Sequence, residues 1–109
     1  MKKSEVVKDN KKFNYIINKG KYIKNNYFVI YIMKSENEKP NFGIAVGTKI
    51  GKAFQRNKYK RQIRSIIDNN KFIFPKNNDY IIIMKKACAN LKYQEMQKEL
   101  VSLIESKVK

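Results

Sequence analysis

Apolar residues recur along this chain with two different periods, and the first segment has the helical one. The stretch after residue 9 places three large apolar side chains on one face, those of Phe13, Ile16 and Ile17. This spacing brings side chains together on a helix. Asp9 or Asn10 can cap the start, and Gly20 can end the helix in a left-handed conformation. The pattern predicts a short amphipathic helix.

Two segments further along have the composition of β-strands. Residues 27–33 are apolar or aromatic throughout and predict a central strand, to which we add a short extra strand around Tyr22. After a charged loop that contains Pro40, residues 42–47 alternate between large apolar side chains and glycine or alanine. One face of that strand is therefore nearly bare, so that a helix, a second backbone or a ligand can approach it closely.

A helix is predicted from about residue 52 to residue 69, and it has two chemically different faces. At about 100° per residue, one stripe is apolar and consists of Tyr59, Ile63, Ile66 and Ile67. A second stripe on another side is polar and cationic, and it consists of Asn57, Lys60, Arg61 and Arg64. The first stripe suits a hydrophobic core, and the second suits an anion.

The remaining segments complete an α+β pattern. Residues 80–84 are continuously apolar, as in a strand covered on both faces, and the helix before them predicts a crossover into a parallel pairing. A final helix from about Leu91 directs five apolar residues to the sheet, namely Tyr93, Met96, Leu100, Leu103 and Ile104. The order α-β-β-α-β-α predicts one α+β domain over residues 1–109, with three helices packed on a small mixed sheet.

Composition adds a large positive charge to this picture. Lys and Arg total 25 against 9 Asp and Glu, for a net charge of +16. Self-repulsion of this size is tolerated mainly when a polyanion neutralises it, so nucleic acid is the expected partner. No apolar run approaches the roughly 18 residues of a spanning helix, and no signal-peptide pattern follows the first lysines. We expect a cytoplasmic protein with no membrane role, because its apolar stripes are needed for the core.

Few residues of this chain suit catalysis or metal binding. The sequence has no histidine, which removes the commonest general base and every histidine-activated nucleophile. The single cysteine, Cys88, is interpreted as a small apolar residue rather than a zinc ligand. Glu95 and Glu99 lie beside lysines, as on an exposed helix face. The loop at residues 47–52 lacks the glycine spacing of a nucleotide hydrolase. A protein nuclease acting alone is therefore disfavoured.

Cations are concentrated in one segment. All three arginines lie between Arg56 and Arg64, within a stretch that has no acid between Glu38 and Asp68. Guanidinium groups bind phosphate through paired hydrogen bonds, and a helix start near Lys52 adds free N–H groups. The predicted phosphate-binding cations are Lys49, Lys52, Arg56, Lys58, Lys60, Arg61 and Arg64. Four aromatic residues can stack on bases or belong to the core, namely Phe13, Tyr15, Tyr27 and Tyr31.

Residues 42–64 also carry a family resemblance. They read Phe-Gly-Ile-Ala-Val-Gly-Thr-Lys-Ile-Gly-Lys-Ala-Phe-Gln-Arg-Asn-Lys-Tyr-Lys-Arg-Gln-Ile-Arg. This resembles the signature of bacterial ribonuclease P protein subunits, in which a strand and a Lys-Ile-Gly-x-Ala loop precede Arg-Asn-Arg-x-Lys-Arg-x-x-Arg. The resemblance extends to the first helix with Phe13 and Gly20 and to the strands at residues 28–31 and 79–83, so it covers most of the chain.

The resemblance implies a non-catalytic subunit of a ribozyme that removes the 5′ leader from precursor transfer RNA. Its implied partners are ribonuclease P RNA and precursor transfer RNA, with no obligate protein partner, and the RNA subunit would hold the catalytic Mg²⁺. It also implies a left-handed β-α-β crossover. The helix residues that would face the catalytic RNA are Arg56, Asn57, Lys58, Lys60, Arg61 and Arg64. The residues that would line a cleft for the leader are Phe13, Ile17 and Tyr31.

Two positions depart from the family pattern. Lys58 stands where the motif has its second arginine, so the charge is kept but the bidentate fork is lost. Ile17 replaces the second aromatic of the first helix and cannot stack on a base as a ring does. A ribosomal protein or a general RNA chaperone on a related scaffold is the alternative function, and composition does not separate it from the first.

Overall fold

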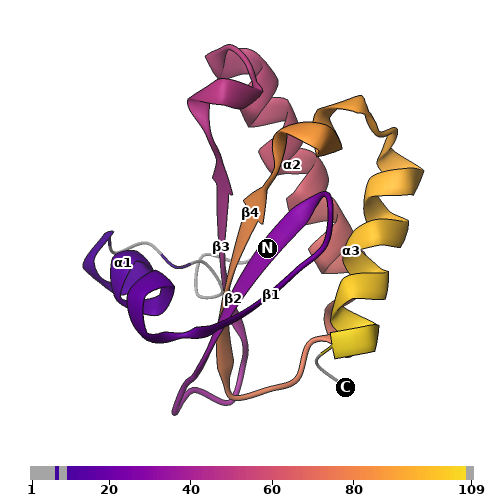
Figure 1. Ribbon diagram of the computed structural model, residues 1–109. Helices are drawn as coiled ribbons and strands as arrows, with labels where there is room; N and C mark the ends of the chain where they lie inside the picture. Colours follow the sequence, from indigo (N-terminus) through magenta and orange to yellow (C-terminus); the bar gives the residue numbers. More distant parts are fainter. Residues whose placement is uncertain (1–6, 8–9, 108–109) are drawn as a thin grey trace.

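The computed structural model describes residue 7 and residues 10–107, which form three helices and four strands (Figure 1). The helices are α1 (Asn10–Lys19), α2 (Ala53–Asn69) and α3 (Tyr93–Lys107). The strands are β1 (Lys21–Lys24), β2 (Phe28–Lys34), β3 (Asn41–Val46) and β4 (Asn78–Met84). Short 3₁₀ turns are η2 (Thr48–Ile50), η3 (Lys71–Ile73) and η4 (Lys86–Asn90). The predicted cap of α1 falls on Asp9 and the side chain of Asn10, which lie outside the described residues.

The four strands form one mixed sheet in the order β1-β2-β4-β3. β2 pairs antiparallel with both β1 and β4, whereas β3 pairs parallel with β4. The extra strand around Tyr22 is therefore confirmed as β1, and β2 is an inner strand as predicted. The parallel pairing of β3 with β4 confirms the crossover that the intervening helix indicated.

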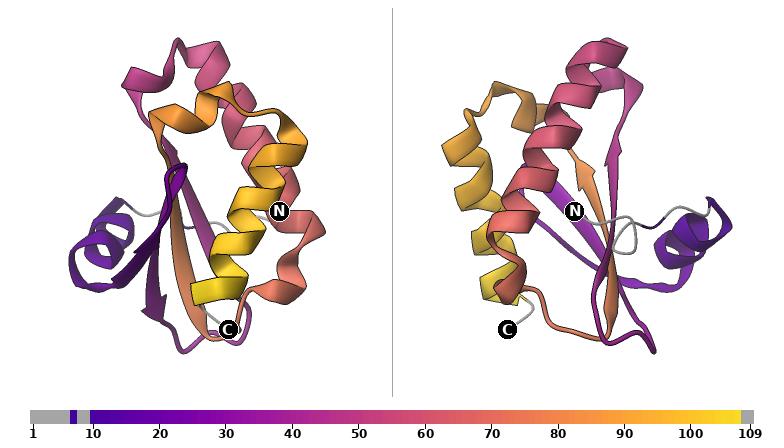
Figure 2. Two further views of the ribbon diagram at one scale, coloured as in Figure 1. Left: turned by 45° about the vertical axis from the view of Figure 1, so that its right-hand side comes forward. Right: turned by 180° about the vertical axis from the view of Figure 1, so that it is seen from behind.

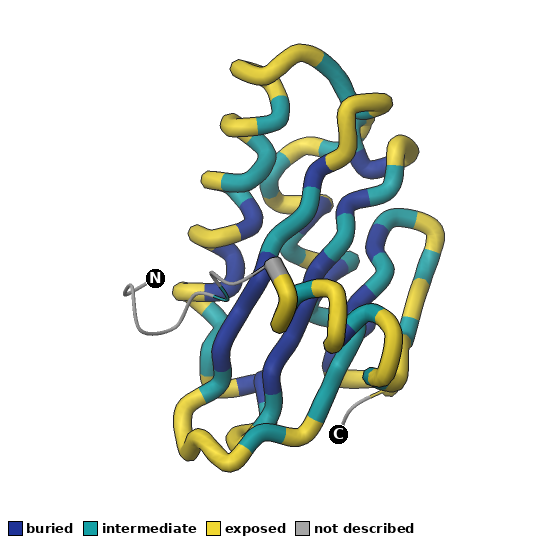
Figure 3. Tube along the Cα trace, turned by 90° about the vertical axis from the view of Figure 1, so that its left-hand side faces the viewer, coloured by how far each residue is buried: buried dark blue, intermediate teal, exposed yellow. Residues whose placement is uncertain are grey.

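The connection from β3 through α2 to β4 is left-handed. Viewed from the side of α1 with both strands pointing up, β3 lies to the left of β4, and α2 passes behind the sheet (Figure 3). Nearly all parallel crossovers have the opposite hand. The order of elements and this handedness agree with the fold that the family resemblance implied.

Helices cover both faces of the sheet (Figure 2). α2 and α3 pack together on one face, where the core includes Ile63, Ile66, Ile67, Met96, Leu100, Leu103 and Ile104. On this side the rings of Phe42 and Tyr80 stack with centroids 5.5 Å apart, and Phe74 meets both rings edge-on. The Tyr80 hydroxyl donates to the carbonyl of Pro75 at 2.6 Å. Its burial raises the pKa of Tyr80 to about 12.

Cys88 lies in the same core and is a free thiol with no exposed surface. Burial raises the pKa of the Cys88 thiol to about 11, because the apolar surroundings disfavour the thiolate. The expectation that this residue serves as a small apolar side chain is therefore confirmed.

α1 packs on the opposite face of the sheet, over the lower part of β4 and β2 (Figure 3). Ile16 of α1 and Ile81 of β4 are both buried there. Lys12 forms an ion pair with Asp79 at 3.3 Å, and the same carboxylate accepts a hydrogen bond from the Asn41 amide at 3.2 Å. These contacts hold α1 against the end of the sheet where β3 begins.

Gly20 ends α1 by a different mechanism from the one predicted. Its φ is not positive, since Gly51 and Asn77 are the residues with positive φ in the described part of the chain. A Cβ at Gly20 would instead lie 2.6 Å from the carbonyl oxygen of Ile16 and 2.9 Å from that of Ile32. The glycine is needed because the chain turns tightly against β2 at this point.

α1 covers the bare face of β3 at Gly43. A Cβ at Gly43 would lie 2.7 Å from Cδ1 of Ile81 and 3.0 Å from Cε2 of Phe13. Of the three options left open by the alternation of glycine and alanine, a packed helix is therefore the one observed. The close approach of Phe13 depends on the absence of a side chain at Gly43.

We expect Gly43→Ala to lower the free energy of unfolding by about 1–3 kcal/mol, because Ile81 is fully buried and cannot move aside freely. Gly47→Ala is the matched control, since a Cβ added at Gly47 would have no atom within 4 Å and its φ is −72°. Urea denaturation of both variants measures the difference. Equal stabilities would contradict the tight packing of Phe13 on β3.

Candidate nucleic-acid interface

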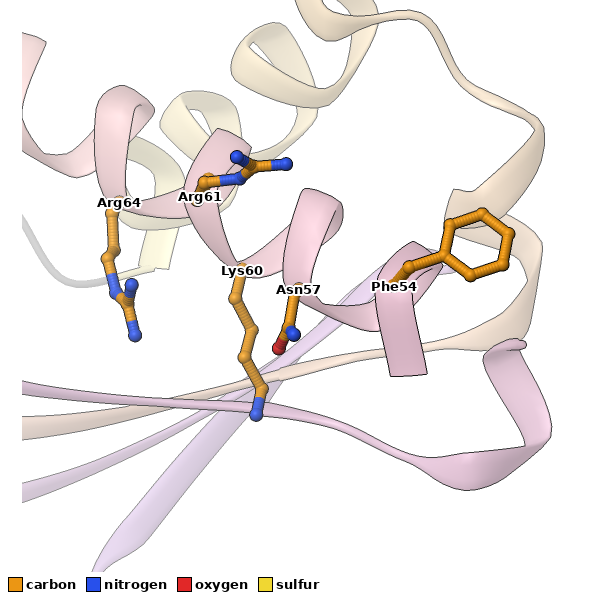
Figure 4. Close-up of a pocket in the computed structure, with 5 residues that line it drawn as sticks. All are labelled: Phe54, Asn57, Lys60, Arg61 and Arg64. Carbon is orange, nitrogen blue, oxygen red and sulfur yellow. The ribbon is translucent and has the colours of Figure 1, made fainter. Parts of the chain in front are cut away.

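The cationic stripe of α2 lines one cavity on the outer side of the helix. This cavity has a volume of about 400 Å³ and is lined by Phe54, Asn57, Lys60, Arg61 and Arg64 (Figure 4). Four of these residues are the polar stripe predicted from helical periodicity. We call the five lining residues the basic face. The structure thus brings the predicted residues of this stripe together in one place.

The basic face is directed outward because the apolar stripe of the same helix is buried. Ile63, Ile66 and Ile67 are at most 1% exposed. Tyr59 is half-buried beside them, and its hydroxyl donates to the carbonyl of Ala89 at 3.4 Å. Burial of the apolar stripe leaves the cations on the accessible side of α2.

Among the residues that the structure describes, no acid lines the cavity of the basic face. Among the described residues, ion pairs of Lys12 with Asp79 and of Lys71 with Asp68 lie elsewhere in the structure. Cations in a shallow cavity attract phosphate groups, and the amide of Asn57 adds both a donor and an acceptor.

The other predicted phosphate-binding residues lie around this cavity rather than in it. Lys49 in η2, Lys52 before α2 and Lys58 in α2 are exposed and can reach an extended polyanion. Arg56 differs from the other two arginines, because it is half-buried and does not line the cavity. Its Nε is buried and has no hydrogen-bond partner within the described chain. The structure therefore separates Arg56 from Arg61 and Arg64.

The start of α2 is partly capped by its own residues. The backbone N–H of Lys52 donates to Oε1 of Gln55 at 2.9 Å, and the carbonyl of Lys52 accepts from the N–H of Arg56 at 3.0 Å. The Lys52 N–H is thus satisfied by Gln55 rather than left free. The positive end of the helix dipole still adds to the field of the lysines around it.

A second cavity of about 180 Å³ lies at the outer edge of β3. It is lined by Val7, Phe13, Phe42, Gly43, Ile44, Lys60 and Arg64. The N–H of Val7 donates to the carbonyl of Phe42 at 2.9 Å, which closes one side of this edge. Lys60 and Arg64 line both cavities, so the basic face continues around β3 to Phe13 of α1. Sequence periodicity alone did not predict this connection.

The residues predicted for a leader cleft all lie at the α1 side of the sheet, and neither of the two cavities described above, among the described residues, contains all three. Phe13 is half-buried over Gly43 and belongs to the second cavity. Ile17 is half-buried on α1, and Tyr31 lies on β2 opposite Ile81. These three side chains are all partly exposed, and Phe13 is the one that lies near Lys60 and Arg64.

The uncovered part of the same sheet face lies beyond α1. Val29, Ile83 and Ala45 form a row across β2, β4 and β3, and all three are half-buried. Tyr22 of β1 adds an exposed ring whose centroid is 5.6 Å from that of Tyr31. An extended ligand can therefore contact aromatic and aliphatic surface along this face.

Sequence reasoning missed Phe54 and Tyr22 as parts of these surfaces. Phe54 precedes Asn57 by three residues and Arg61 by seven, so a helical projection places it on the cationic side. A large apolar residue outside the apolar stripe was the available signal. Tyr22 could have been found once β1 was paired with β2, because Tyr22 is opposite Tyr31 in that register.

The donor atoms of these surfaces do not suit a resident divalent metal. The residues of both cavities supply ammonium, guanidinium, amide and apolar groups, whereas Mg²⁺ prefers carboxylate oxygens. Across the described residues, no three His, Cys, Asp or Glu side chains gather into a metal-binding group. No described helix is long and apolar enough to cross a membrane.

Comparison with known proteins relates this chain to a protein family. The family model for ribonuclease P matches residues 1–108. The ribonuclease P protein component of Mycoplasma capricolum is 46% identical over 105 residues, covering 95% of this chain and 96% of that protein. The ribonuclease P protein of Staphylococcus aureus, solved at 2.0 Å, superposes with a TM-score of 0.88 at 30% identity and covers 97% of this chain and 98% of that one.

The ribonuclease P protein from Thermotoga maritima is also similar, with a TM-score of 0.86, 31% identity, and coverage of 94% of this chain and 96% of that one. The sequence relatives and the solved structures therefore agree over nearly the whole chain. Together with the left-handed crossover and the cationic helix, they show that this chain belongs to the ribonuclease P protein family.

Proposed function

We propose that this chain acts as the protein subunit of ribonuclease P and binds both the catalytic RNA and the 5′ leader of precursor transfer RNA. The observation that carries the proposal is the basic face, an acid-free cationic cavity on a helix of a ribonuclease P protein. Endonucleolytic removal of the leader is the reaction of the holoenzyme. The protein supplies binding surface to that reaction.

The polar residues of the basic face, the exposed lysines around it and the half-buried Arg56 are the proposed contact for the RNA subunit. The proposed set is Lys49, Lys52, Arg56, Asn57, Lys58, Lys60, Arg61 and Arg64. Each neutralised phosphate releases condensed counterions, so contact with about six phosphates gives log affinity a slope of roughly −4 to −5 against log salt. Arg61 and Arg64 are the strongest members, because they line the cavity and can bind phosphate with two parallel hydrogen bonds.

The α1 side of the sheet is the proposed site for the single-stranded leader. Phe13, Ile17 and Tyr31 offer apolar contacts, and a ring stacked on a base contributes about 1–3 kcal/mol. Lys60 and Arg64 lie at the Phe13 end of this surface, where they can hold leader phosphates. The shared cations let one protein contact the leader and the catalytic RNA at adjoining positions.

The chemistry of the chain supports a binding role rather than a protein-based reaction, and we propose that this role is exercised in the cytoplasm. Histidine is absent from the sequence, and the cavities are lined by cations and apolar groups. We propose that Mg²⁺ is held by the RNA subunit, where it supplies the activating and charge-stabilising chemistry of phosphodiester cleavage. The protein contributes by neutralising the charge of the RNAs that have to come together.

The alternative function as a ribosomal protein or general RNA chaperone is not favoured, because every relative described above is a ribonuclease P protein. We expect the purified chain to lower the Mg²⁺ concentration that ribonuclease P RNA needs to cleave a 5′-extended precursor at near-physiological salt. Gel analysis of cleavage over a Mg²⁺ titration measures this effect. An unchanged requirement, or cleavage by the protein without RNA, would overturn the proposal.

Substitution of Arg61 or Arg64 by alanine should weaken binding to ribonuclease P RNA and reduce the salt slope by about one ion or less. Both residues are exposed, so folding should be unaffected. Lys98→Ala removes the same charge from an exposed position on α3 and serves as the control. Filter binding at several salt concentrations gives both quantities. Equal effects at all three positions would mean that net charge alone, and not the basic face, determines binding.

Phe13→Ala should reduce affinity for a leader-bearing precursor but not for mature transfer RNA, when each binds to the holoenzyme. The reason is that Phe13 belongs to the proposed leader surface and does not line the cavity of the basic face. Since Phe13 also packs on Gly43, the stability of the variant has to be checked by denaturation. Phe13→Tyr should keep the ring and the preference for the leader. Equal losses for both RNAs would remove Phe13 from the leader site.

A further inference from the structure

Phe54 is a large apolar side chain that does not belong to the hydrophobic core. It lies in the first turn of α2, and 68% of its surface is exposed. It stands nine residues before Ile63, which at about 100° per residue is the opposite side of the helix from that core position. Hydrophobic packing within this chain therefore gives no reason for an aromatic ring here.

The surroundings of Phe54 are chemically specific. The ring lines the same cavity as Asn57, Lys60, Arg61 and Arg64, and no acid is present among them. Figure 4 shows the ring extending from the N-terminal end of α2, with the side chains of Asn57, Lys60, Arg61 and Arg64 following along the helix. One exposed aromatic ring next to an amide and three cations is a combination that suits a nucleotide, which has a flat base and an anionic phosphate.

The combination suits an unpaired nucleotide better than a duplex. In an RNA helix the base faces are stacked on each other, and a protein contacts phosphates, 2′-hydroxyl groups and groove edges. Cations alone are sufficient for such contacts. An exposed ring such as that of Phe54 can stack on a base that has left its own stack, because stacking requires a free base face.

We propose that Phe54 is a stacking platform for an unpaired nucleobase of the RNA that occupies the basic face. Asn57, one helical turn after Phe54, offers an amide to the edge of that base, and Lys60, Arg61 and Arg64 offer cations to the adjoining phosphates. This inference rests on the proposed function, since it assumes that the basic face binds RNA. It adds that the bound RNA is single-stranded at this point, in a loop, bulge or end.

A second exposed phenylalanine provides a matched comparison. Phe72 in η3 is 80% exposed, so its removal also deletes an exposed ring from the surface. Its cavity also contains Lys39, Lys71 and Lys76, and Lys71 pairs with Asp68 at 3.6 Å. The cavity beside Phe72 contains none of the residues of the basic face. Phe72→Ala therefore controls for the general loss of an aromatic ring.

The test measures binding of the full chain to ribonuclease P RNA over a range of salt concentrations. We expect Phe54→Ala to weaken binding roughly 5- to 150-fold, the range for loss of one stacked base. The salt slope should stay unchanged, because the ring carries no charge. Phe54→Tyr should retain affinity, Phe54→Leu should lose it, and Phe72→Ala should bind like the parent chain.

The same variants are then tested on a short single-stranded RNA and on a duplex of the same sequence. Phe54→Ala should weaken binding to the single strand and leave binding to the duplex unchanged. Because the ring is mostly exposed, urea denaturation of Phe54→Ala should match that of the parent chain. The stacking proposal would be overturned if Phe54→Ala or Phe54→Leu bound RNA as tightly as the parent chain. It would also be overturned if Phe54→Ala lost the same affinity for the single strand as for the duplex.

Failure of this inference is distinguishable from failure of the proposed function. If Arg61→Ala and Arg64→Ala weaken RNA binding while Phe54→Ala does not, the basic face binds RNA without a stacked base, and the stacking proposal alone is overturned. If neither arginine variant affects binding, the basic face is not the RNA site, and the assignment in the proposed function is overturned as well.

Discussion

Burial of one stripe of α2 against the sheet is the constraint on which the rest of the structure depends. Ile63, Ile66 and Ile67 are almost completely buried, and together they fix the rotation of the helix about its axis. Burial of these three isoleucine side chains contributes on the order of 5–9 kcal/mol to the stability of the fold. Burial of unpaired cations in their place would cost far more free energy. The cationic stripe of α2 therefore has to lie at the outer surface. Orientation of the basic face is therefore a consequence of core packing.

The position of α2 in the topology decides what the basic face adjoins. α2 connects the edge strand β3 to the inner strand β4. It lies on the face of the sheet opposite α1. At the outer edge of β3, Lys60 and Arg64 line the same cavity as Phe13 of α1. Two surfaces from opposite faces of the sheet thereby become continuous. Lys60 and Arg64 can therefore contact a ligand on either surface.

The net charge of +16 links the stability of the folded chain to the binding of RNA. Like charges on one small chain repel one another, and a bound polyanion removes that repulsion. Binding of RNA should thus stabilise the folded chain as well as the complex, because a ligand that binds only the native state shifts the folding equilibrium toward it. Folding stability and RNA affinity are coupled through the same cations.

Local patterns in the sequence determined the elements, their inner and outer faces, the parallel pairing through α2, and the set of cations on that helix. They did so because helical and strand periodicity are properties of neighbouring residues. Only the tertiary structure decided that Phe13 covers Gly43, that Arg56 is half-buried, and that Lys60 and Arg64 share a cavity with Phe13. Periodicity states which way a side chain points from its own element. What it meets there depends on segments far away in the chain, whose approach is set by packing.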